Sequence, residues 1–233
     1  MEFPIRINKY LAQKNYASRR EADELVERGF VTINGAPATL GDMVNEGDDV
    51  NVIDHERAPY TYYAYYKPRG IVTIGAQGNE TEITDATHFP VDVFPIGRLD
   101  KDSEGLIIMT NDGRITDPLL SPDHTHEKEY AVTVDRPITH QAMVKMRNGV
   151  RIDIGRKKYT TKKTRLRRTS KNSFDIILTE GKNRQIRKMC GAVGFKVIAL
   201  KRFRIMDISL DDMKPGQYRD LGSDFGDRIL KNT

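Results

Sequence analysis

The chain contains 233 residues, which is long for one domain and comfortable for two. Hydrophobic residues make up 38% of it, enough for a buried core, and no apolar run approaches the roughly 20 residues that a membrane-spanning helix needs. The single cysteine, Cys190, excludes an internal disulfide and fits a reducing compartment, so we expect a cytoplasmic protein without a membrane segment.

Positive and negative charges are segregated along the chain. Residues 156–204 contain 17 lysines and arginines but only two acidic residues, Asp175 and Glu180. This segment therefore carries a net charge of +15, while the whole chain carries only +5. Such asymmetry predicts one positive face, which favours a polyanionic partner such as nucleic acid. The alternative is a solvated basic surface that binds nothing.

The first 50 residues predict two short helices and a small sheet. Apolar residues recur at helical spacing over residues 5–16. Ser18-Arg19-Arg20-Glu21 has the form of a capping box, which begins a second helix that ends near Gly29. Residues 31–33 then form a strand that enters an Asn34-Gly35 turn, the strongest short hairpin signal.

Several cations lie on or near the two expected helices. They are Arg6, Lys9, Lys14, Arg19, Arg20 and Arg28. A helix pair that carries arginine and lysine can bind phosphates across an RNA groove. Because residues 1–50 also contain nine acidic residues, a pair of ordinary amphipathic helices is the alternative.

This first segment resembles an S4 RNA-binding domain. The matching residues are 5–11 (IRINKYL), 18–22 (SRREA) and 29–35 (GFVTING). The resemblance implies structured RNA as the partner, with Arg6, Lys9, Arg19 and Arg20 as RNA contacts. It implies no particular reaction, because S4 domains occur in several kinds of RNA-binding protein.

A linker and an aromatic strand follow. Residues 51–60 have a weak pattern, several charges and a proline, and we interpret them as the linker. Residues 62–66 (YYAYY) predict a strand that ends in a Lys67-Pro68-Arg69-Gly70 turn. The tyrosines could stack on bases, but in a strand half of them are expected in the core.

Residues 97–106 (GRLDKDSEGL) place a carboxylate, Asp100, in a loop bounded by glycines. The apolar residues 106–109 predict a buried strand directly after the loop. Loops at a sheet edge often carry chemistry on a rigid scaffold. Taken alone, an aspartate in such a loop is more often a turn former or a cap than a nucleophile.

The second half predicts alternating strands and helices. Residues 128–134 form a strand in which Tyr130 has the pattern of a core aromatic. Thr139 caps a helix that ends at Gly149. Eight cations without one acid predict an exposed basic strand or hairpin over residues 156–168, suited to sequence-independent phosphate contact.

A buried strand over residues 174–178 leads into the last predicted helix. This helix begins at Lys182 and runs to about Val193, with Arg184 and Arg187 off its inner face. Positive charge at a helix start opposes the macrodipole, which suggests that these arginines meet an anion. The last dozen residues are expected to fray.

Four motifs along the chain resemble the bacterial rRNA pseudouridine synthases that carry an S4 domain before the catalytic domain. They are Lys67-Pro68-x-Gly70, residues 97–106, Lys128-x-Tyr130-x-Val132 and residues 180–187 (EGKNRQIR). Residues 94–96 and 126–135 are most similar to a member that acts on the large subunit. The resemblance implies an α+β protein with an S4 domain (1–50), a linker (51–60) and a catalytic domain (61–233) built on a mainly antiparallel mixed sheet.

The resemblance also implies a role for each motif residue. Asp100 would be the catalytic aspartate, acting at ribose C1′ or C2′. Burial alone favours the neutral form of a carboxyl group, so a cation is needed to keep it charged, and the family pattern places Arg187 there. Tyr130 would stack on the uracil, and Arg98 would fill the space that the flipped base leaves. The other expected substrate contacts are Leu178, Arg184 and Lys67.

The implied partner is 23S rRNA or a ribosomal assembly intermediate, bound by a monomer that needs no cofactor and no metal. His124 and His126 could share a strand face, but no third ligand lies nearby. The same chemistry on 16S rRNA or tRNA is one alternative, and a non-catalytic RNA-binding or ribosome-assembly protein is another. A hydrolase with paired carboxylates Asp100 and Asp102 ranks last, because residues so close on one loop flank a substrate poorly.

Overall fold

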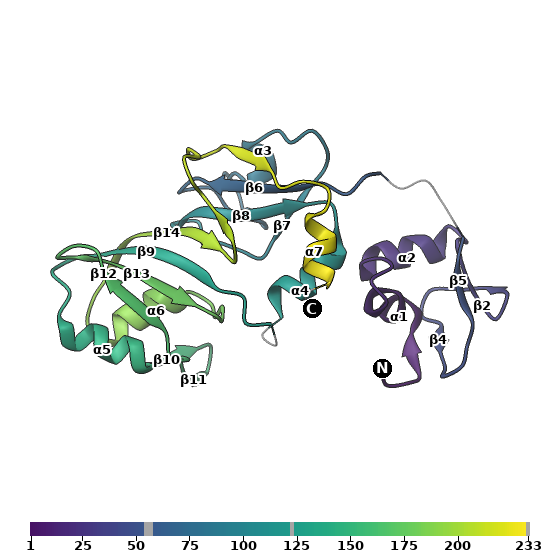
Figure 1. The fold of residues 1–233 in the computed structure, drawn as a ribbon, viewed down its shortest axis with the longest axis horizontal. Helices are drawn as coiled ribbons and strands as arrows, with labels where there is room; N and C mark the ends of the chain where they lie inside the picture. The colour runs from purple at the N-terminus through teal and green to yellow at the C-terminus, as the bar shows by residue number, and fades with distance from the viewer. Residues whose placement is uncertain (54–57, 122–123, 232–233) are drawn as a thin grey trace. The chain divides into compact units, whose positions relative to one another are not determined.

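Figure 1 shows the fold in a computed structural model, which describes residues 1–53, 58–121 and 124–231. Contacts divide the chain into two compact units. The first contains residues 1–62, 110–119 and 221–233, and the second contains residues 63–109 and 120–220. The expected domain over 61–233 therefore does not coincide with the second unit, because residues 61–62, 110–119 and 221–233 group with the N-terminal residues.

The first unit opens with two helices on small sheets. Its elements here are β1 (Ile5–Arg6), α1 (Ile7–Gln13), α2 (Arg19–Glu27), β2 (Val31–Ile33), β3 (Ala36–Pro37), β4 (Met43–Val44) and β5 (Val50–Val52). The Ser18 capping box is confirmed, with Ser18 Oγ accepting from Glu21 N at 3.2 Å. The hairpin is confirmed too, since β2 and β3 pair across Asn34 and Gly35, both at positive φ.

Strand β5 pairs with β2 and runs to Val52, two residues into the segment expected as a linker. Residues 54–57 of that segment lie outside the described residues.

The remaining elements build the second unit and complete the first. They are β6 (Tyr62–Lys67), α3 (Ile83–Ala86), β7 (Phe94–Ile96), β8 (Glu104–Thr110), a 3-10 turn (Gly113–Ile115), α4 (Thr116–Leu120), β9 (Lys128–Val134), α5 (His140–Asn148), β10 (Arg151–Ile154), β11 (Lys157–Thr160), β12 (Arg165–Arg168), β13 (Ser173–Leu178), α6 (Gln185–Ala192), β14 (Val197–Ile205), β15 (Ile208–Ser209), β16 (Tyr218–Asp220) and α7 (Phe225–Lys231). None of the described helices has the length and apolar composition needed to cross a membrane.

A mixed sheet runs in the order β12-β13-β9-β14-β8-β6-β16, with β15 added to β14 and β7 to β8. Among the described registers, β14 with β8 is parallel and the other pairs of this sheet are antiparallel. This confirms the expected α+β class with a mainly antiparallel sheet. Helices α5 and α6 cover one face of β9 and β13, where their apolar side chains form a common core (Figure 1).

The structure extends one expectation from local pattern and contradicts another. All six residues of β6 are buried, so its tyrosines are core residues and do not offer stacking surfaces in this structure. Residues 225–231, which were expected to fray, form helix α7, and this helix buries Phe225 and Ile229. A side chain at Gly226 would overlap the hydroxyl of Tyr62, so the close approach of this helix depends on a glycine that its apolar pattern does not single out.

Candidate active site

The loop that carries Asp100 is held by bonds from the residues that follow β6. Thr73 Oγ1 donates to Leu99 O at 2.7 Å and lies 3.1 Å from Leu99 N, which donates back to it. Gly70 N donates to Lys101 O at 2.7 Å. Asp100 thus lies on a loop that is held on both sides of it, between β7 and β8, with 30% of its side chain exposed.

Gly105 allows β8 and β14 to meet directly after this loop. It pairs with Arg202 in the parallel register and has a φ of 120°, a conformation that favours glycine. A Cβ atom here would lie 2.6 and 2.8 Å from Arg202 N and C and would overlap Arg202 O. No side chain fits between the two strands.

We therefore expect Gly105→Ala to lower the free energy of unfolding by about 3 kcal/mol or more, because it adds backbone overlap to backbone strain. Chemical denaturation measures this change. Gly78→Ala is the matched control, since Gly78 also has a positive φ but has open space around it. The control should cost about 1 kcal/mol, and equal losses in the two variants would contradict the close approach.

Two arginines of the α6 region face the Asp100 loop. Arg184 Nη1 lies 3.5 Å from Asp100 Oδ2, and Arg187 Nε lies 3.9 Å from the same oxygen. Arg187 Nη2 also donates to Asp102 O and to Ser103 Oγ, each at 3.0 Å. The structure thus brings the expected residues Asp100, Arg184 and Arg187 together.

Helix α6 starts later than the sequence predicts. It begins at Gln185 and not at Lys182, because Arg184 has a left-handed conformation with φ 51°. Gln185 is buried and donates through Nε2 to Glu180 Oε1 at 2.7 Å. Glu180 also accepts from the hydroxyl of Tyr159, and this bond raises the pKa of Tyr159 to about 12. A buried polar cluster therefore sets where the helix begins and how its arginines project.

Lys67, which the resemblance predicts as a substrate contact, lies inside the protein in this structure. Its side chain is fully buried, and Nζ donates to Pro68 O at 2.8 Å and Ile71 O at 2.6 Å. Burial lowers the pKa of Lys67 to about 8, although the charge of Asp100 acts in the opposite direction. Lys67 holds the turn after β6 from inside the protein.

Tyr130 and Leu178 lie on neighbouring strands. Tyr130 pairs with Ile176 of β13 on one side and with Arg202 of β14 on the other, and it is half-buried against the α5–α6 core. Leu178 is buried and pairs with Lys128, two residues before Tyr130. The two residues thus lie close together in the sheet.

The remaining expected contacts are exposed cations. Arg98 is exposed at the start of the Asp100 loop. The other four, Arg6, Lys9, Arg19 and Arg20, are exposed on the first unit.

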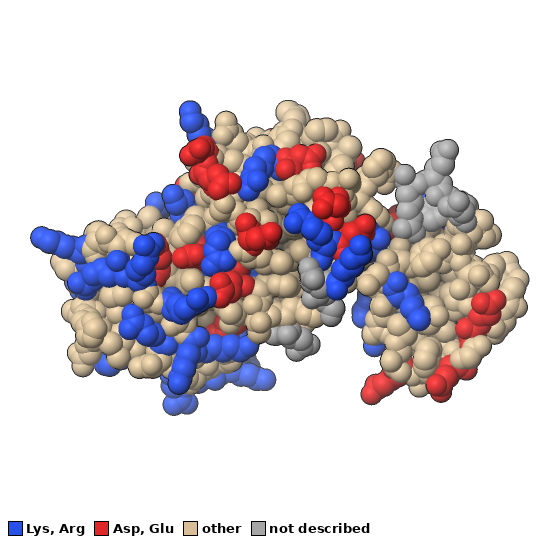
Figure 2. All heavy atoms as spheres, viewed as in Figure 1, with Lys and Arg blue, Asp and Glu red and all other residues tan. Residues whose placement is uncertain are grey.

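The basic segment is exposed as expected and forms the hairpin β10–β11 followed by the edge strand β12. We call its exposed cations the basic face: Arg156, Lys157, Lys158, Lys162, Lys163, Arg165, Arg167 and Arg168. Figure 2 shows lysines and arginines gathered over this part of the second unit.

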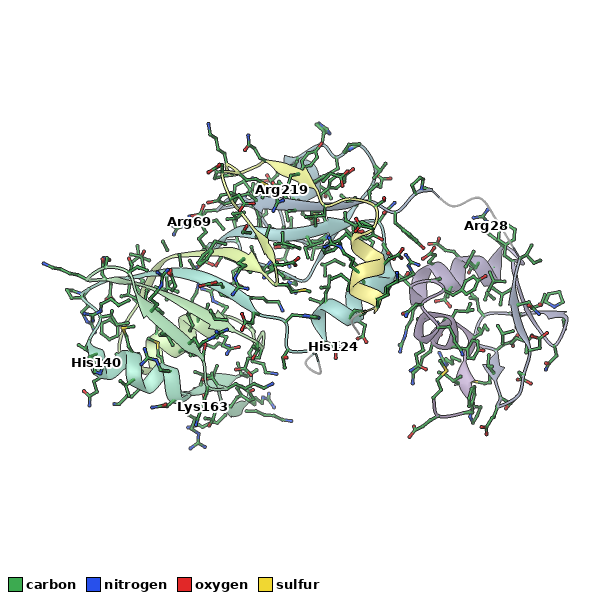
Figure 3. All side chains as sticks on the ribbon, viewed as in Figure 1. Arg28, Arg69, His124, His140, Lys163 and Arg219 are labelled. Carbon is green, nitrogen blue, oxygen red and sulfur yellow. The ribbon has the colours of Figure 1, made fainter. Side chains whose placement is uncertain are left out.

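Sequence reasoning missed several residues that shape this site. Asp102 appeared only as half of an unlikely carboxylate pair, yet it binds both arginines. Gln185 was noted only within a motif, and Glu180 only there and as one of two acids in residues 156–204. Arg69 (Figure 3), on the turn after β6, lies near enough for its charge to act on Arg187, whose pKa is lowered chiefly by burial. The signal available for Arg69 was its place inside the Lys67-Pro68-x-Gly70 motif.

The residues described include no group of three histidine, cysteine or carboxylate side chains that could hold a metal ion. His124 and His126 stack with ring centroids 5.9 Å apart.

The site is a carboxylate beside two arginines, on a mixed sheet that also carries the basic face. This combination is typical of an enzyme that acts on nucleic acid. Comparisons with known proteins give the family. The family model described as RNA pseudouridylate synthase matches residues 61–192, and the S4 domain model matches residues 5–50. This chain belongs to the RNA pseudouridylate synthase family, and it is an isomerase that acts on RNA.

Individual relatives match over nearly the whole chain. The dual-specificity RNA pseudouridine synthase RluF of Escherichia coli K12 is 43% identical over 225 residues, covering 94% of this chain and 76% of the relative. The ribosomal large subunit pseudouridine synthase B of Bacillus subtilis 168 is 34% identical over 223 residues, covering 93% and 91%. A solved pseudouridylate synthase superposes with a TM-score of 0.70 at 26% identity, covering 97% of this chain and 99% of that one.

Proposed function

We propose that this protein converts a specific uridine of 23S rRNA to pseudouridine, with Asp100 as the catalytic carboxylate. The observation that carries the proposal is the Asp100 side chain, fixed on its loop at 3.5 and 3.9 Å from nitrogens of Arg184 and Arg187. The large-subunit name of the Bacillus subtilis relative supports the choice of rRNA.

The reaction breaks the bond between uracil N1 and ribose C1′, and C5 then bonds to C1′ in its place. The proton on C5 is lost and N1 regains one, so no oxidant or reductant is consumed. An ionised Asp100 either attacks C1′ or removes the C2′ proton. The guanidinium groups nearby favour the charged form of the carboxylate that either step needs.

Tyr130 stacks on the flipped uracil in this proposal, with Leu178 packing beside it. Their adjacent places on β9 and β13 suit a base that enters against the sheet. Arg98 is exposed at the start of the catalytic loop, where its side chain is free to enter the RNA stack that the base leaves.

RNA binding is assigned to two surfaces, the exposed cations of the first unit and the basic face. Replacing Lys157 and Lys163 of the basic face with alanine is expected to raise KM for an RNA substrate about 10-fold, with kcat nearly unchanged, because phosphate contacts position the RNA and do not act on the base. The slope of log Kd against log salt should become shallower by about 1 to 2.

Lys145→Ala with Lys214→Ala is the matched control for that pair. Both lysines are exposed but lie outside the basic face, so the same loss of charge should leave KM and the salt slope nearly unchanged. Equal effects of the two double variants would mean that only net charge matters.

The function is tested by mapping pseudouridine, with carbodiimide treatment and primer extension, on RNA from cells with and without the gene. Loss of one 23S site, restored by the wild-type gene, is the expected result. An unchanged map in 23S rRNA, 16S rRNA and tRNA would instead support a non-catalytic RNA-binding protein.

A second RNA target is a further candidate, because the relative that is 43% identical is named as dual-specificity. The same maps test it: a tRNA site lost and restored together with the 23S site would show that one active site accepts both RNAs.

A further inference from the structure

Asp102, two residues after Asp100 on the same loop, binds the arginines more closely than Asp100 does. Arg184 donates to it with both arms of its guanidinium, Nη1 to Oδ1 at 3.2 Å and Nη2 to Oδ2 at 3.1 Å. Arg187 Nη2 lies 3.3 Å from Asp102 Oδ2. The carboxylate that is not expected to react therefore takes the paired, two-pronged contact.

The Asp100 carboxylate, by contrast, accepts no hydrogen bond from the residues that the structure describes. Its two nearest cationic nitrogens stop at 3.5 and 3.9 Å. The nearer of them, Arg184 Nη1, is already donating to Asp102. The other, Arg187 Nε, is buried and has no hydrogen-bond partner.

This division of contacts suits the chemistry of a reacting carboxylate. An oxygen that attacks carbon or accepts a proton needs a free lone pair, which a two-pronged guanidinium contact would occupy. The same oxygen needs positive charge nearby to stay ionised. A second carboxylate that binds the arginines satisfies both needs. It holds the two guanidinium groups near Asp100 but keeps them from forming hydrogen bonds with the Asp100 oxygens.

The backbone supports the same reading of Arg184. Its φ of 51° is unusual for a residue other than glycine, and such strain persists where the surrounding structure requires one geometry. The left-handed turn sits directly before α6, whose first residue is anchored by Glu180. The backbone of Arg184 is therefore held by the start of α6, and its guanidinium group is held by Asp102.

We propose that Asp102 is a positioning residue that holds both guanidinium groups away from the Asp100 carboxylate and so keeps its oxygens free to react. The inference rests on the proposed role of Asp100. The charge of Asp102 is assured near neutral pH: burial acts to raise its pKa, but the hydrogen bonds from Arg184 and the charge of Arg187 outweigh this and lower it.

Other charges also surround the loop and belong in any pH argument. Lys67 lies beneath it, close enough to interact with Asp100, Asp102 and Glu104. Arg69 lies near Arg187. None of these is changed by the substitution that follows.

The test is the pH–rate profile of Asp102→Asn under single-turnover conditions, with a 23S fragment as substrate. Without the Asp102 charge, both arginines move onto Asp100. We expect the plateau rate to fall about 10- to 100-fold and the acid limb to move to lower pH, because more positive charge then favours the ionised carboxylate. Asp102→Glu keeps the negative charge. It should recover most of the wild-type plateau rate, and its acid limb should lie close to the wild-type position.

Glu80→Gln is the matched control. It removes a negative charge that pairs with Lys101 on the same loop but does not contact the arginines, so its profile should match that of the wild type. An unchanged profile for Asp102→Asn, or a lower rate with an unmoved acid limb in both Asp102 variants, would overturn the inference. Asp100→Asn measured in parallel separates the two levels: if it stays active, the proposed function itself fails.

Discussion

Asp100→Asn is expected to lower the rate of pseudouridine formation by about 10⁴-fold or more, with RNA affinity close to that of the wild type. Asparagine has nearly the same shape but cannot be the anionic nucleophile or base that either form of the reaction needs. Single-turnover assays with a 23S fragment measure the rate, and filter binding measures the affinity. In cells, the same variant should fail to restore the pseudouridine that is lost with the gene.

The geometry makes this test clean, because the Asp100 carboxylate accepts no hydrogen bond from the described residues and its loss breaks none. Thermal unfolding should therefore be nearly unchanged. Asp92→Asn is the matched control, an exposed aspartate of the same unit that should behave as the wild type. An Asp100→Asn enzyme within 10-fold of the wild-type rate would remove Asp100 from the chemistry.

Arg187→Gln is expected to have the second largest effect, a loss of about 10²- to 10³-fold in rate. The side chain is 12% exposed and joins the Asp100 loop to β14, donating to Asp102 O, Ser103 Oγ and Val197 O. Removing it leaves buried acceptors unpaired, which costs about 1–3 kcal/mol of stability. It also removes the buried cation beside the Asp100 carboxylate.

The pH dependence separates the electrostatic part of this loss from the structural part. Without the Arg187 charge, the neutral acid form of Asp100 is favoured, so a higher pH is needed to reach the plateau rate and the acid limb moves up. This direction is opposite to that expected for Asp102→Asn. Arg187→Lys keeps the positive charge but loses the paired N–H donors of the guanidinium group. It should give an intermediate rate and a smaller shift of the acid limb.

Lys188→Gln is the control for the Arg187 variants. Lys188 follows Arg187 directly on α6, but its Nζ donates to the nearby Asn183, in an exposed bond. Its loss should leave both rate and profile nearly unchanged. If Arg187→Gln lowered the rate with no change in the acid limb, the role of Arg187 would be structural only.

Features that depend on neighbouring residues were predictable from the sequence. The Ser18 capping box, the Asn34-Gly35 hairpin and the helix between Thr139 and Gly149 each follow from short-range backbone and capping rules. The strand at 128–134 follows from its alternation. The exposed basic segment is likewise a local matter, since so many adjacent cations cannot all be buried.

The same local order allowed Asp100 to be singled out, and the motif resemblance linked it with Arg187 before any geometry was known. The sequence could not place the contacts that act over long separations. Asp102 and Arg184 are 82 residues apart in the sequence. Only the packing of α6 against the loop after β7 brings the Arg184 guanidinium group to the Asp102 carboxylate.

Burial decided the rest. The sequence around Lys67 predicts an exposed cation beside a turn. In the structure Lys67 is buried, and its ammonium group donates to two backbone carbonyl groups. Gly105 is required only because β14 passes against it. Helix α6 begins at Gln185, where Glu180, in the segment after β13, accepts a hydrogen bond from the Gln185 side chain. The chain by itself determined the local elements and the charged face, and it singled out Asp100 as the candidate catalytic residue. The tertiary structure determined which cations reach that residue, because hydrogen-bond and packing partners distant in sequence are chosen only when the sheet and helices assemble.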